Sequence, residues 1–404
     1  MTNITNYLFL SCLIPEEREK KIKDLSKRNM QDAANELQWK IYNGLCENLG
    51  QGIHIVNKLP VGSFPQYYKK AFVETEYFST KHNAVNVNVG FCNIKFLRNF
   101  FVVKPIYREI LKWCKHNKDE KIIFMYTLSL PFIKVIEKIK KKYSNVSICA
   151  IVADLPNMSC LSKKRNKIQD IFIKTSSKKV YKKIQCVDYF VLLSKHMAEY
   201  MKVNKPYCIM EGISTENTIE TVNNTKKKII VYSGTLHEKF GVLNLVQAFQ
   251  QIKNSNYELI ICGIGDSQAK IEAATKIDDR IKFMGQLSHD EVIELQRHAT
   301  VLVNPRQNIE EFTKYSFPSK NLEYLSSGVP LIAYKLDGIP DEYDDYIIYP
   351  KSNSVEDLAK CIEKICNLNE EERRQIGTKA KKFVSENKNY IVQTKKIIDL
   401  IENK

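Results

Sequence analysis

The 404-residue chain contains no run of about 18 apolar residues, so no stretch of it is long enough to cross a membrane as a helix. The apolar stretch at residues 7–13 has no basic residue ahead of it, which is unlike a signal peptide and favours a first β-strand. Eleven cysteines are present without a CxxC pair or a His/Cys cluster. This usage indicates free thiols in the cytosol rather than a disulfide framework or a zinc site.

The chain also has neither a Walker A sequence nor a GxGxxG fingerprint, so nothing in it requires a nucleoside triphosphate or a nicotinamide cofactor. No group of residues has the spacing of metal ligands. We therefore expect neither a cofactor nor a metal.

Negative charge is scarce in the first half of the chain. Residues 1–205 contain 36 Lys and Arg against 17 Asp and Glu, a net charge of +19, whereas residues 206–404 contain 26 and 29, a net charge of −3. A basic half predicts an anionic partner: nucleic acid, anionic lipid or a phosphorylated substrate. No zinc finger, RNA-binding signature or aromatic–basic stacking motif supports nucleic acid, and we do not expect it.

Short runs rich in Val, Ile and Phe alternate with helix-like stretches through both halves. This pattern predicts an α/β fold of two doubly wound, Rossmann-like domains. We expect an acceptor-binding domain at residues 1–205, a donor-binding domain at residues 206–385 and a tail helix at residues 386–404, with a linker around residues 205–228. Ligands of such sheets bind beyond the carboxyl ends of the strands, which predicts a site in a cleft between the domains.

Three glycine turns follow predicted strands in the second half. In "VYSGTLHEKFGV" Gly234 opens a loop that carries Lys239, and glycines let a backbone approach a phosphate that a lysine neutralises. A plain strand–turn–helix with a solvated lysine is the alternative. "IICGIGD" makes a similar corner. In "FMGQLSHDEV" the backbone from Gly285 to Leu287 would reach a nucleotide base.

The stretch "FPSKNLEYLSSGVPLIA" predicts a helix with Pro318 just inside its start. The amides of Ser319, Lys320 and Asn321 lack intrahelical acceptors at such a start, and the helix dipole and the lysine add positive charge. Glu323 lies about one turn, roughly 5 Å, further along and would accept hydrogen bonds from ribose hydroxyls. The alternative is an ordinary surface helix. A diphosphate at the helix start beside a ribose describes a nucleoside diphosphate.

In order and spacing, these motifs resemble the donor domain of glycosyltransferase family 4, retaining enzymes of the GT-B fold, over about residues 228–345. The first half resembles it more weakly, through "AANELQWKIYNGL", "IVADLP" and "DYFVLLSKHMAEYM". The resemblance implies that Lys239 contacts the donor diphosphate, that Glu323 binds ribose and that the tail helix crosses back to the first domain. It further implies metal-independent transfer from a nucleotide-sugar to a saccharide acceptor, taken here to be lipid-linked, in capsule, exopolysaccharide or O-antigen assembly at the cytosolic face of the membrane.

The chain departs from the family pattern in its donor half. The family places a first glutamate eight residues before Glu323, where this chain has Tyr315, and Glu310 or Glu311 would stand in for it. The family often has an arginine where this chain has Thr235, and Arg306 would supply that cation. Thr235 and Arg306 are therefore predicted to lie at the donor site, with Arg306 and Glu311 as candidate catalytic residues.

In the first half, the family's His–Asp pair is Ala153–Asp154. This makes Asp154 a candidate catalytic residue, with a structural role in the turn at Pro156 as the alternative. Two other functions stay open on these grounds: a noncatalytic nucleotide-sugar-binding or scaffold subunit, and a soluble transferase acting on a small molecule.

The segment at residues 162–185 contains nine lysines and arginines, and apolar residues recur among them at helix-like intervals. It would lie on an anionic membrane surface or near a lipid-diphosphate acceptor. A solvated helix that covers the sheet is the alternative.

Overall fold

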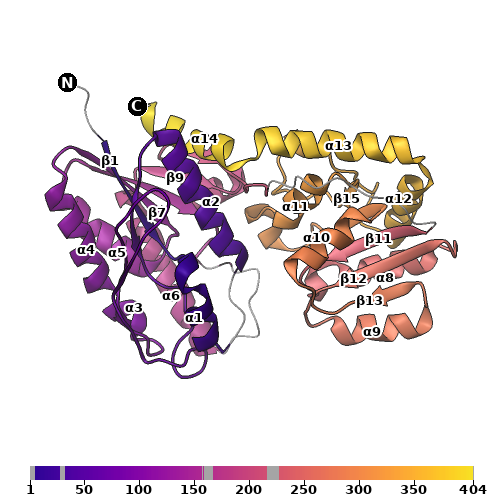
Figure 1. Ribbon diagram of the computed structural model, residues 1–404, viewed down its shortest axis with the longest axis horizontal. Helices are drawn as coiled ribbons and strands as arrows, with labels where there is room; N and C mark the ends of the chain where they lie inside the picture. Colours follow the sequence, from indigo (N-terminus) through magenta and orange to yellow (C-terminus); the bar gives the residue numbers. More distant parts are fainter. Residues whose placement is uncertain (1–4, 28–31, 157, 159–166, 216–226, 404) are drawn as a thin grey trace. The chain divides into compact units, whose positions relative to one another are not determined.

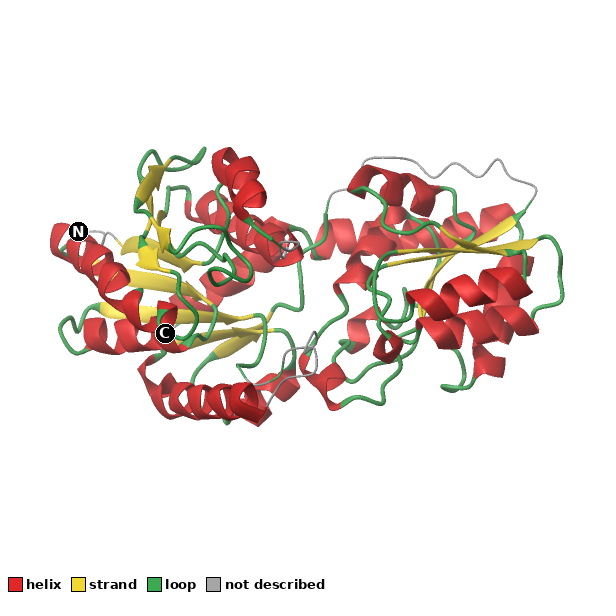
Figure 2. Ribbon diagram, turned by 90° about the horizontal axis from the view of Figure 1, so that it is seen from below, coloured by secondary structure: helices red, strands yellow, loops and turns green. Residues whose placement is uncertain are grey.

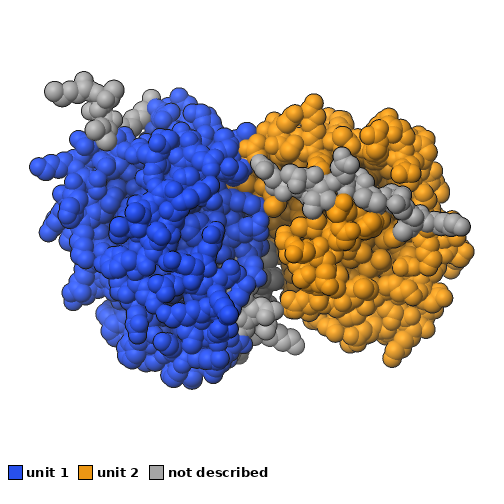
Figure 3. Space-filling model, in the orientation of Figure 1, with its two compact units in different colours: residues 1–211, 390–404 blue, residues 212–389 orange. Residues whose placement is uncertain are grey.

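The computed structural model describes residues 5–27, 32–156, 158, 167–215 and 227–403. The chain forms two compact units (Figure 3): residues 1–211 with 390–404 make unit 1, and residues 212–389 make unit 2. The first boundary lies six residues beyond the expected one, and the chain returns to unit 1 at residue 390 rather than 386.

Unit 1 is built on an eight-stranded sheet of order β10-β9-β8-β7-β1-β2-β5-β4, parallel except for the pair of β4 with β5. The strands of this sheet are β1 (Thr5–Ser11), β2 (His54–Asn57), β4 (Glu76–Phe78), β5 (Asn86–Asn88), β7 (Glu120–Tyr126), β8 (Val146–Val152), β9 (Tyr189–Leu192) and β10 (Tyr207–Ile209). A separate antiparallel pair consists of β3 (Phe72–Val73) and β6 (Phe91–Cys92).

The helices of unit 1 are α1 (Glu19–Leu25), α2 (Asp32–Leu49), α3 (Arg98–Phe101), α4 (Val103–His116), α5 (Leu130–Lys140), α6 (Lys167–Lys183), α7 (Lys195–Met201) and α14 (Tyr390–Glu402). The tail helix α14 packs on α2 (Figure 1). Gly44 permits this contact, because a Cβ there would lie 2.5 Å from the carbonyl oxygen of Tyr390. Asn48 then donates a hydrogen bond of 2.9 Å to Thr394 Oγ1.

Two expectations for the first half need correction. The segment expected to be a linker begins with β10, which pairs in parallel with β9 and extends the sheet of unit 1. Residues 216–226 of that segment lie outside the described residues. Residues 61–100, whose sequence shows no regular pattern and which were expected to be less regular, contain four short strands and most of α3, elements too short for periodicity to reveal.

Unit 2 has a five-stranded, fully parallel sheet of order β13-β12-β11-β14-β15. Its strands are β11 (Lys228–Ser233), β12 (Tyr257–Cys262), β13 (Ile281–Phe283), β14 (Val301–Asn304) and β15 (Leu331–Ala333). Its helices are α8 (Val242–Gln251), α9 (Gln268–Ile277), α10 (His289–Arg297), α11 (Ser319–Ser327), α12 (Val355–Asn367) and α13 (Glu370–Asn387).

Helices lie on both faces of the unit 2 sheet (Figure 2). Successive side chains of β11 enter different cores because a strand alternates its faces: Ile230 belongs to one apolar cluster and Val231 to the other. The strand order reverses between β11 and β14, and such a switch point leaves room for a ligand at the carboxyl ends of the strands. Within the described residues, no helix is long and apolar enough to cross a membrane.

Candidate functional site

The loops that follow β11 and β12 pack together through glycines. Gly263 has a φ of +136°, and a Cβ there would lie 1.8 Å from the carbonyl oxygen of Gly234. Gly241, with a φ of +80°, approaches the loop after β14 in the same way, because its Cβ would lie 1.9 Å from the carbonyl oxygen of Pro305. Only glycine fits these positions, so the backbones of these loops lie in direct contact.

Lys239 and Arg306, both predicted to lie at the donor site, share this edge. The Lys239 ammonium lies 5.4 Å from the ring centroid of Phe240 and 5.3 Å from that of Phe312. The Arg306 guanidinium lies 5.2 Å and 4.4 Å from the same centroids. Arg306 is only 9% exposed and donates a 3.0 Å hydrogen bond to Ser316 Oγ. The structure thus brings two cations from distant loops onto one pair of rings.

Helix α11 begins at Ser319, with Pro318 as its N-cap residue rather than inside the helix. The amides of Ser319 and Lys320 donate to no acceptor among the described residues, which agrees with an anion-binding helix start. The prediction for Asn321 is wrong. Its amide donates to the carbonyl oxygen of Pro318 at 2.8 Å, and its buried side chain accepts a hydrogen bond of 2.6 Å from Asn304. The first turn tightens there and uses that amide internally.

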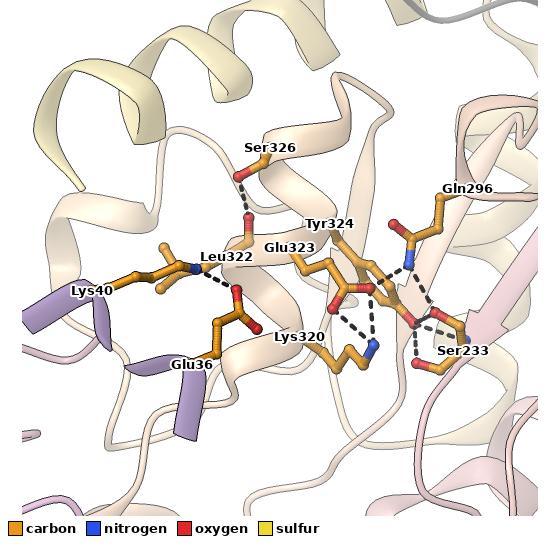
Figure 4. Close-up of polar contacts among 9 residues, drawn as sticks. All are labelled: Glu36, Lys40, Ser233, Gln296, Lys320, Leu322, Glu323, Tyr324 and Ser326. Carbon is orange, nitrogen blue, oxygen red and sulfur yellow. Dashed lines mark hydrogen bonds and ion pairs between the residues drawn. The ribbon is translucent and has the colours of Figure 1, made fainter. Parts of the chain in front are cut away.

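Glu323 lies one turn after the helix start and is half-buried. Its two carboxylate oxygens accept hydrogen bonds of 2.9 and 2.8 Å from the Lys320 ammonium, and one of them accepts a further bond of 2.6 Å from Gln296 Nε2 (Figure 4). A carboxylate has about four acceptor positions, so about one remains for a hydroxyl donor while these three bonds are made. The ion pair also keeps Lys320 beside Gly234, where a Cβ would lie 3.9 Å from Lys320 Cε.

A buried network beneath Glu323 was missed by the sequence analysis. The Tyr324 hydroxyl accepts from the amide of Ser233 at 2.8 Å and donates to its carbonyl oxygen at 2.9 Å (Figure 4). Gln296 Nε2 bonds Ser233 Oγ at 2.9 Å as well as Glu323. The network ties α10 and α11 to the end of β11 and so fixes the orientation of Glu323. A glutamine in the apolar stripe of α10 was the available signal.

The remaining donor-site predictions fall on the loops after β11 and β13. Thr235 is exposed, and its carbonyl oxygen accepts a 2.8 Å bond from the Tyr232 hydroxyl. The carbonyl oxygen of Gly285, which has a φ of +66°, accepts from Gly263 N at 2.7 Å, so these loops are joined. Leu287 is half-buried in the next turn. Met284 is 52% exposed and offers apolar surface at this edge.

Glu311 begins a 3-10 turn, Glu311–Tyr315, between Arg306 and the start of α11. Its side chain is exposed, and the Tyr315 hydroxyl lies 3.5 Å from one carboxylate oxygen, at the long limit of a hydrogen bond. The next residue, Phe312, carries the ring under Arg306. The backbone therefore places Glu311 near the cations without fixing its carboxylate.

In unit 1, Asp154 follows β8 at the carboxyl edge of the sheet. Desolvation by the surrounding protein raises its pKa to about 6, although part of the side chain is open to water. The neighbouring Tyr126, at the end of β7, has its pKa raised chiefly by burial and further by the charge of Asp154. Asp154 is thus an acid near neutrality at the edge where ligands of such sheets bind.

The basic segment at residues 162–185 forms α6 from Lys167 to Lys183. Val180 and Ile184 are buried inside unit 1, so these two apolar residues pack on the protein. Residues 163–165, which carry three of its charges, lie outside the described residues. Among the described residues, no group of three or more His, Cys, Asp and Glu side chains could hold a metal ion.

Two Rossmann-like units with parallel sheets define a GT-B fold, and solved structures of GT-B glycosyltransferases share it along the whole chain. Residues 214–383, which lie within unit 2, match the family model of glycosyl transferases group 1. No curated protein matches the chain in sequence.

Sucrose-phosphate synthase from Thermosynechococcus elongatus has a TM-score of 0.64 at 15% identity and covers 98% of each chain. The lipopolysaccharide outer core galactosyltransferase WaaB has a TM-score of 0.61 at 16% identity over 99% of each chain. HepE of Anabaena, solved in complex with UDP, has a TM-score of 0.61 at 10% identity over 99% of this chain and 100% of its own. At these identities the likeness concerns the fold. With the family match it supports a glycosyltransferase of the GT-B type.

Proposed function

We propose that this protein transfers a sugar from a nucleotide-sugar donor bound by unit 2 to a saccharide acceptor bound by unit 1. The observation that carries the proposal is the arrangement of Lys239 and Arg306 on shared rings, with the open amides of Ser319 and Lys320 and the carboxylate of Glu323 on α11. Cations and amides suit a diphosphate, and a carboxylate suits ribose hydroxyls.

In this proposal the cationic groups stabilise the departing diphosphate, where negative charge develops in the transition state. Lys239 and Arg306 would meet that charge directly, and the α11 dipole would add to it. We propose membership of glycosyltransferase family 4, retention of anomeric configuration and transfer without a metal ion. Activity that persists in excess chelator supports transfer without a metal ion. An anomeric configuration of the product that matches the donor, assigned by NMR, supports retention.

We further propose a lipid-linked acceptor in polysaccharide assembly, with unit 1 held at the inner face of the membrane by its positive charge. The net charge of +19 over residues 1–205 supports this placement, since each basic residue near an anionic surface contributes about 1 kcal/mol. Val180 and Ile184 are buried, so attachment would be electrostatic. Cosedimentation with anionic but not neutral vesicles, abolished by high salt, is the expected result; equal pelleting with both would contradict it.

The donor proposal is tested by thermal unfolding with UDP, GDP and ADP, because a ligand that binds only the folded state raises the melting temperature. One nucleoside diphosphate is expected to stabilise the protein, and the corresponding nucleotide-sugar to be hydrolysed slowly or transferred. Tyr315, in place of a family glutamate, favours a second candidate, a noncatalytic nucleotide-sugar-binding subunit. Donor binding without hydrolysis or transfer would establish that candidate.

A further inference from the structure

A buried lysine in unit 1 has no acidic partner. Lys58 directly follows β2, where its amide continues the sheet by bonding the carbonyl oxygen of Ser11 at 3.0 Å, and the residue is only 9% exposed. It forms no ion pair with any described residue, and the nearest recorded partner of its ammonium is the Phe91 ring, 5.9 Å away. The unit 1 residues outside the described set include no Asp or Glu in the sequence. A buried ammonium is costly unless something pairs with it.

A second cation lies beside this lysine. Arg98, the first residue of α3, donates through Nη1 to the carbonyl oxygen of Val61 at 2.9 Å, which anchors one side of its guanidinium. Burial lowers the pKa of Lys58, Cys12 opposes this shift, and the positive charge of Arg98 lowers the pKa by a smaller amount. The two cations are therefore close enough to repel one another. This repulsion adds to the cost of burying the charge of Lys58.

The strand ends around Lys58 carry further polar groups. Asn57 donates to Asn88 Oδ1 at 2.5 Å, and the register places Asn88 opposite Asn57 at the end of β5. Asn88 is fully buried, and its Nδ2 has no partner among the described residues. Unsatisfied buried donors are rare in folded proteins. Polar and cationic groups thus lie at the strand ends on this edge of the sheet, where an anion would compensate the buried charge of Lys58.

The same edge carries Asp154. Asp154 follows β8 and Lys58 follows β2, and two strands lie between them in the order β8-β7-β1-β2. Three strand spacings amount to about 14 Å. Cys12, at the end of β1, interacts electrostatically with Lys58 and with Tyr126, and the charge of Asp154 contributes to raising the pKa of Tyr126. The two positions belong to one continuous edge and suit a molecule whose acidic group is several bonds away from its reacting hydroxyl.

We propose that Lys58 and Arg98 form an anion subsite in unit 1 that binds a phosphate group of the acceptor. Phosphate fits because a lysine acts on it as a point charge and an arginine as a planar fork. The identification of the ligand as the acceptor rests on the proposed glycosyltransferase function, whereas the anion subsite does not. The phosphate would belong either to a soluble sugar phosphate or to a phospholipid-type carrier.

The subsite is tested by calorimetric titration of inorganic phosphate into the full-length protein at constant ionic strength, with and without UDP. We expect Lys58→Met and Arg98→Gln each to weaken phosphate binding at least tenfold. Lys95→Met is the matched control, since Lys95 also lies over a phenylalanine, 5.4 Å from the Phe96 ring, but is exposed. It should leave phosphate affinity unchanged. Equal affinity in wild type and Lys58→Met, or a loss as large in Lys95→Met, would overturn the proposal.

The source of the phosphate is resolved by two further ligands measured on the same variants. If glucose 6-phosphate competes with inorganic phosphate in the wild type but not in Lys58→Met, the ligand of the subsite is a soluble sugar phosphate. A lipid phosphate is identified if the protein binds vesicles that contain phosphatidate but not vesicles of phosphatidylcholine alone. This binding should be lost in Lys58→Met and kept in Lys95→Met. Tryptophan fluorescence like that of the wild type shows that unit 1 of Lys58→Met is folded, because Trp39 and Trp113 both belong to unit 1. Failure of UDP, GDP and ADP alike to bind any variant would count against the donor proposal and leave the subsite standing.

Discussion

Lys239 and Arg306 hold their cationic groups over the same two aromatic rings, those of Phe240 and Phe312. The electron-rich ring faces attract both cations and offset part of their mutual repulsion. Lys239 forms no ion pair with a described residue, so its charge remains available to a ligand. The pair is therefore arranged for an anion larger than one oxygen, which agrees with a diphosphate.

Replacing Lys239 by Met should weaken nucleoside diphosphate binding by about 1.5–3 kcal/mol, on the order of ten- to hundredfold, because one charge-assisted hydrogen bond is lost. Calorimetry with the diphosphate that stabilises the wild type measures this. Lys276→Met, at an exposed position in the last turn of α9, is the control and should bind normally. Normal binding by folded Lys239→Met would remove Lys239 from the donor site.

Arg306→Lys keeps the charge but loses the planar fork and its stacking on Phe312. Because Arg306 also bonds Ser316 Oγ, a lysine would be able to serve either that hydroxyl or the donor, not both. We expect kcat/KM for transfer to fall about tenfold or more, with little change in unfolding free energy. Ser316→Ala removes the hydroxyl alone and should have the smaller effect. Equal activity of Arg306→Lys and wild type would show that a simple positive charge suffices.

Glu323→Gln separates ribose recognition from phosphate recognition. The change removes the carboxylate that would bind ribose and also releases Lys320 from its ion pair. We therefore expect weaker binding of UDP, or of whichever nucleoside diphosphate binds, by on the order of tenfold, with pyrophosphate binding retained or strengthened. Parallel weakening of both ligands would indicate that Glu323 acts by positioning Lys320 and does not contact ribose.

The sequence predicted the elements that present Lys239, Arg306 and Glu323, because parallel strands followed by glycine turns and a helix start are visible in local patterns. It did not predict that Phe240 and Phe312 would hold the two cations together. That contact joins two loops, and pairing of distant side chains leaves no periodic signal. The same holds for Gln296 and Tyr324 beneath the carboxylate.

Asn321 shows a different limit. Its position in the first turn of α11 predicted a free amide, but the turn closed more tightly than an ideal α-helix and used that amide. In unit 1, Lys58 was one of 36 basic residues in its half of the chain, and nothing in the sequence distinguished it from the solvated ones. Burial without an acidic partner is a property of the folded structure alone.

Asp154 should cause kcat/KM of the transfer reaction to fall at low pH, which gives the pH profile an acid limb. Its pKa is about 6 because the surrounding protein desolvates it, so the carboxyl group is mostly protonated below pH 6 and mostly ionised above. If the carboxylate accepts hydrogen bonds from substrate hydroxyls, kcat/KM should fall about tenfold per pH unit below pH 6 and level off above it. Asp154→Asn should have lower activity at pH 8 and lack this limb. The same limb in Asp154→Asn would assign it to another group.

Lys58→Met should stabilise unit 1 while it weakens phosphate binding at least tenfold, a combination expected of a binding residue but not of a structural one. Burial lowers the pKa of Lys58 in the folded state below its unfolded value of about 10.4, Arg98 lowers it further, and Cys12 acts in the opposite direction. Below its lowered pKa the lysine is charged in both the folded and the unfolded state, so the cost of burying its charge is fully present there. Methionine removes that cost, and we expect a gain of about 0.5–2 kcal/mol, reduced by the lost contact with the Phe91 ring.

As the pH rises through the lowered pKa towards the unfolded value, the folded lysine loses its proton first, and the wild type recovers stability. The advantage of Lys58→Met should therefore be largest at pH 7 and smaller at pH 10. Urea unfolding followed by tryptophan fluorescence measures it, because Trp39 and Trp113, the only tryptophans in the sequence, both belong to unit 1. Lys95→Met should unfold like the wild type at both pH values. A Lys58→Met protein that is less stable at pH 7 would show that the lysine holds the fold together through contacts that methionine cannot make.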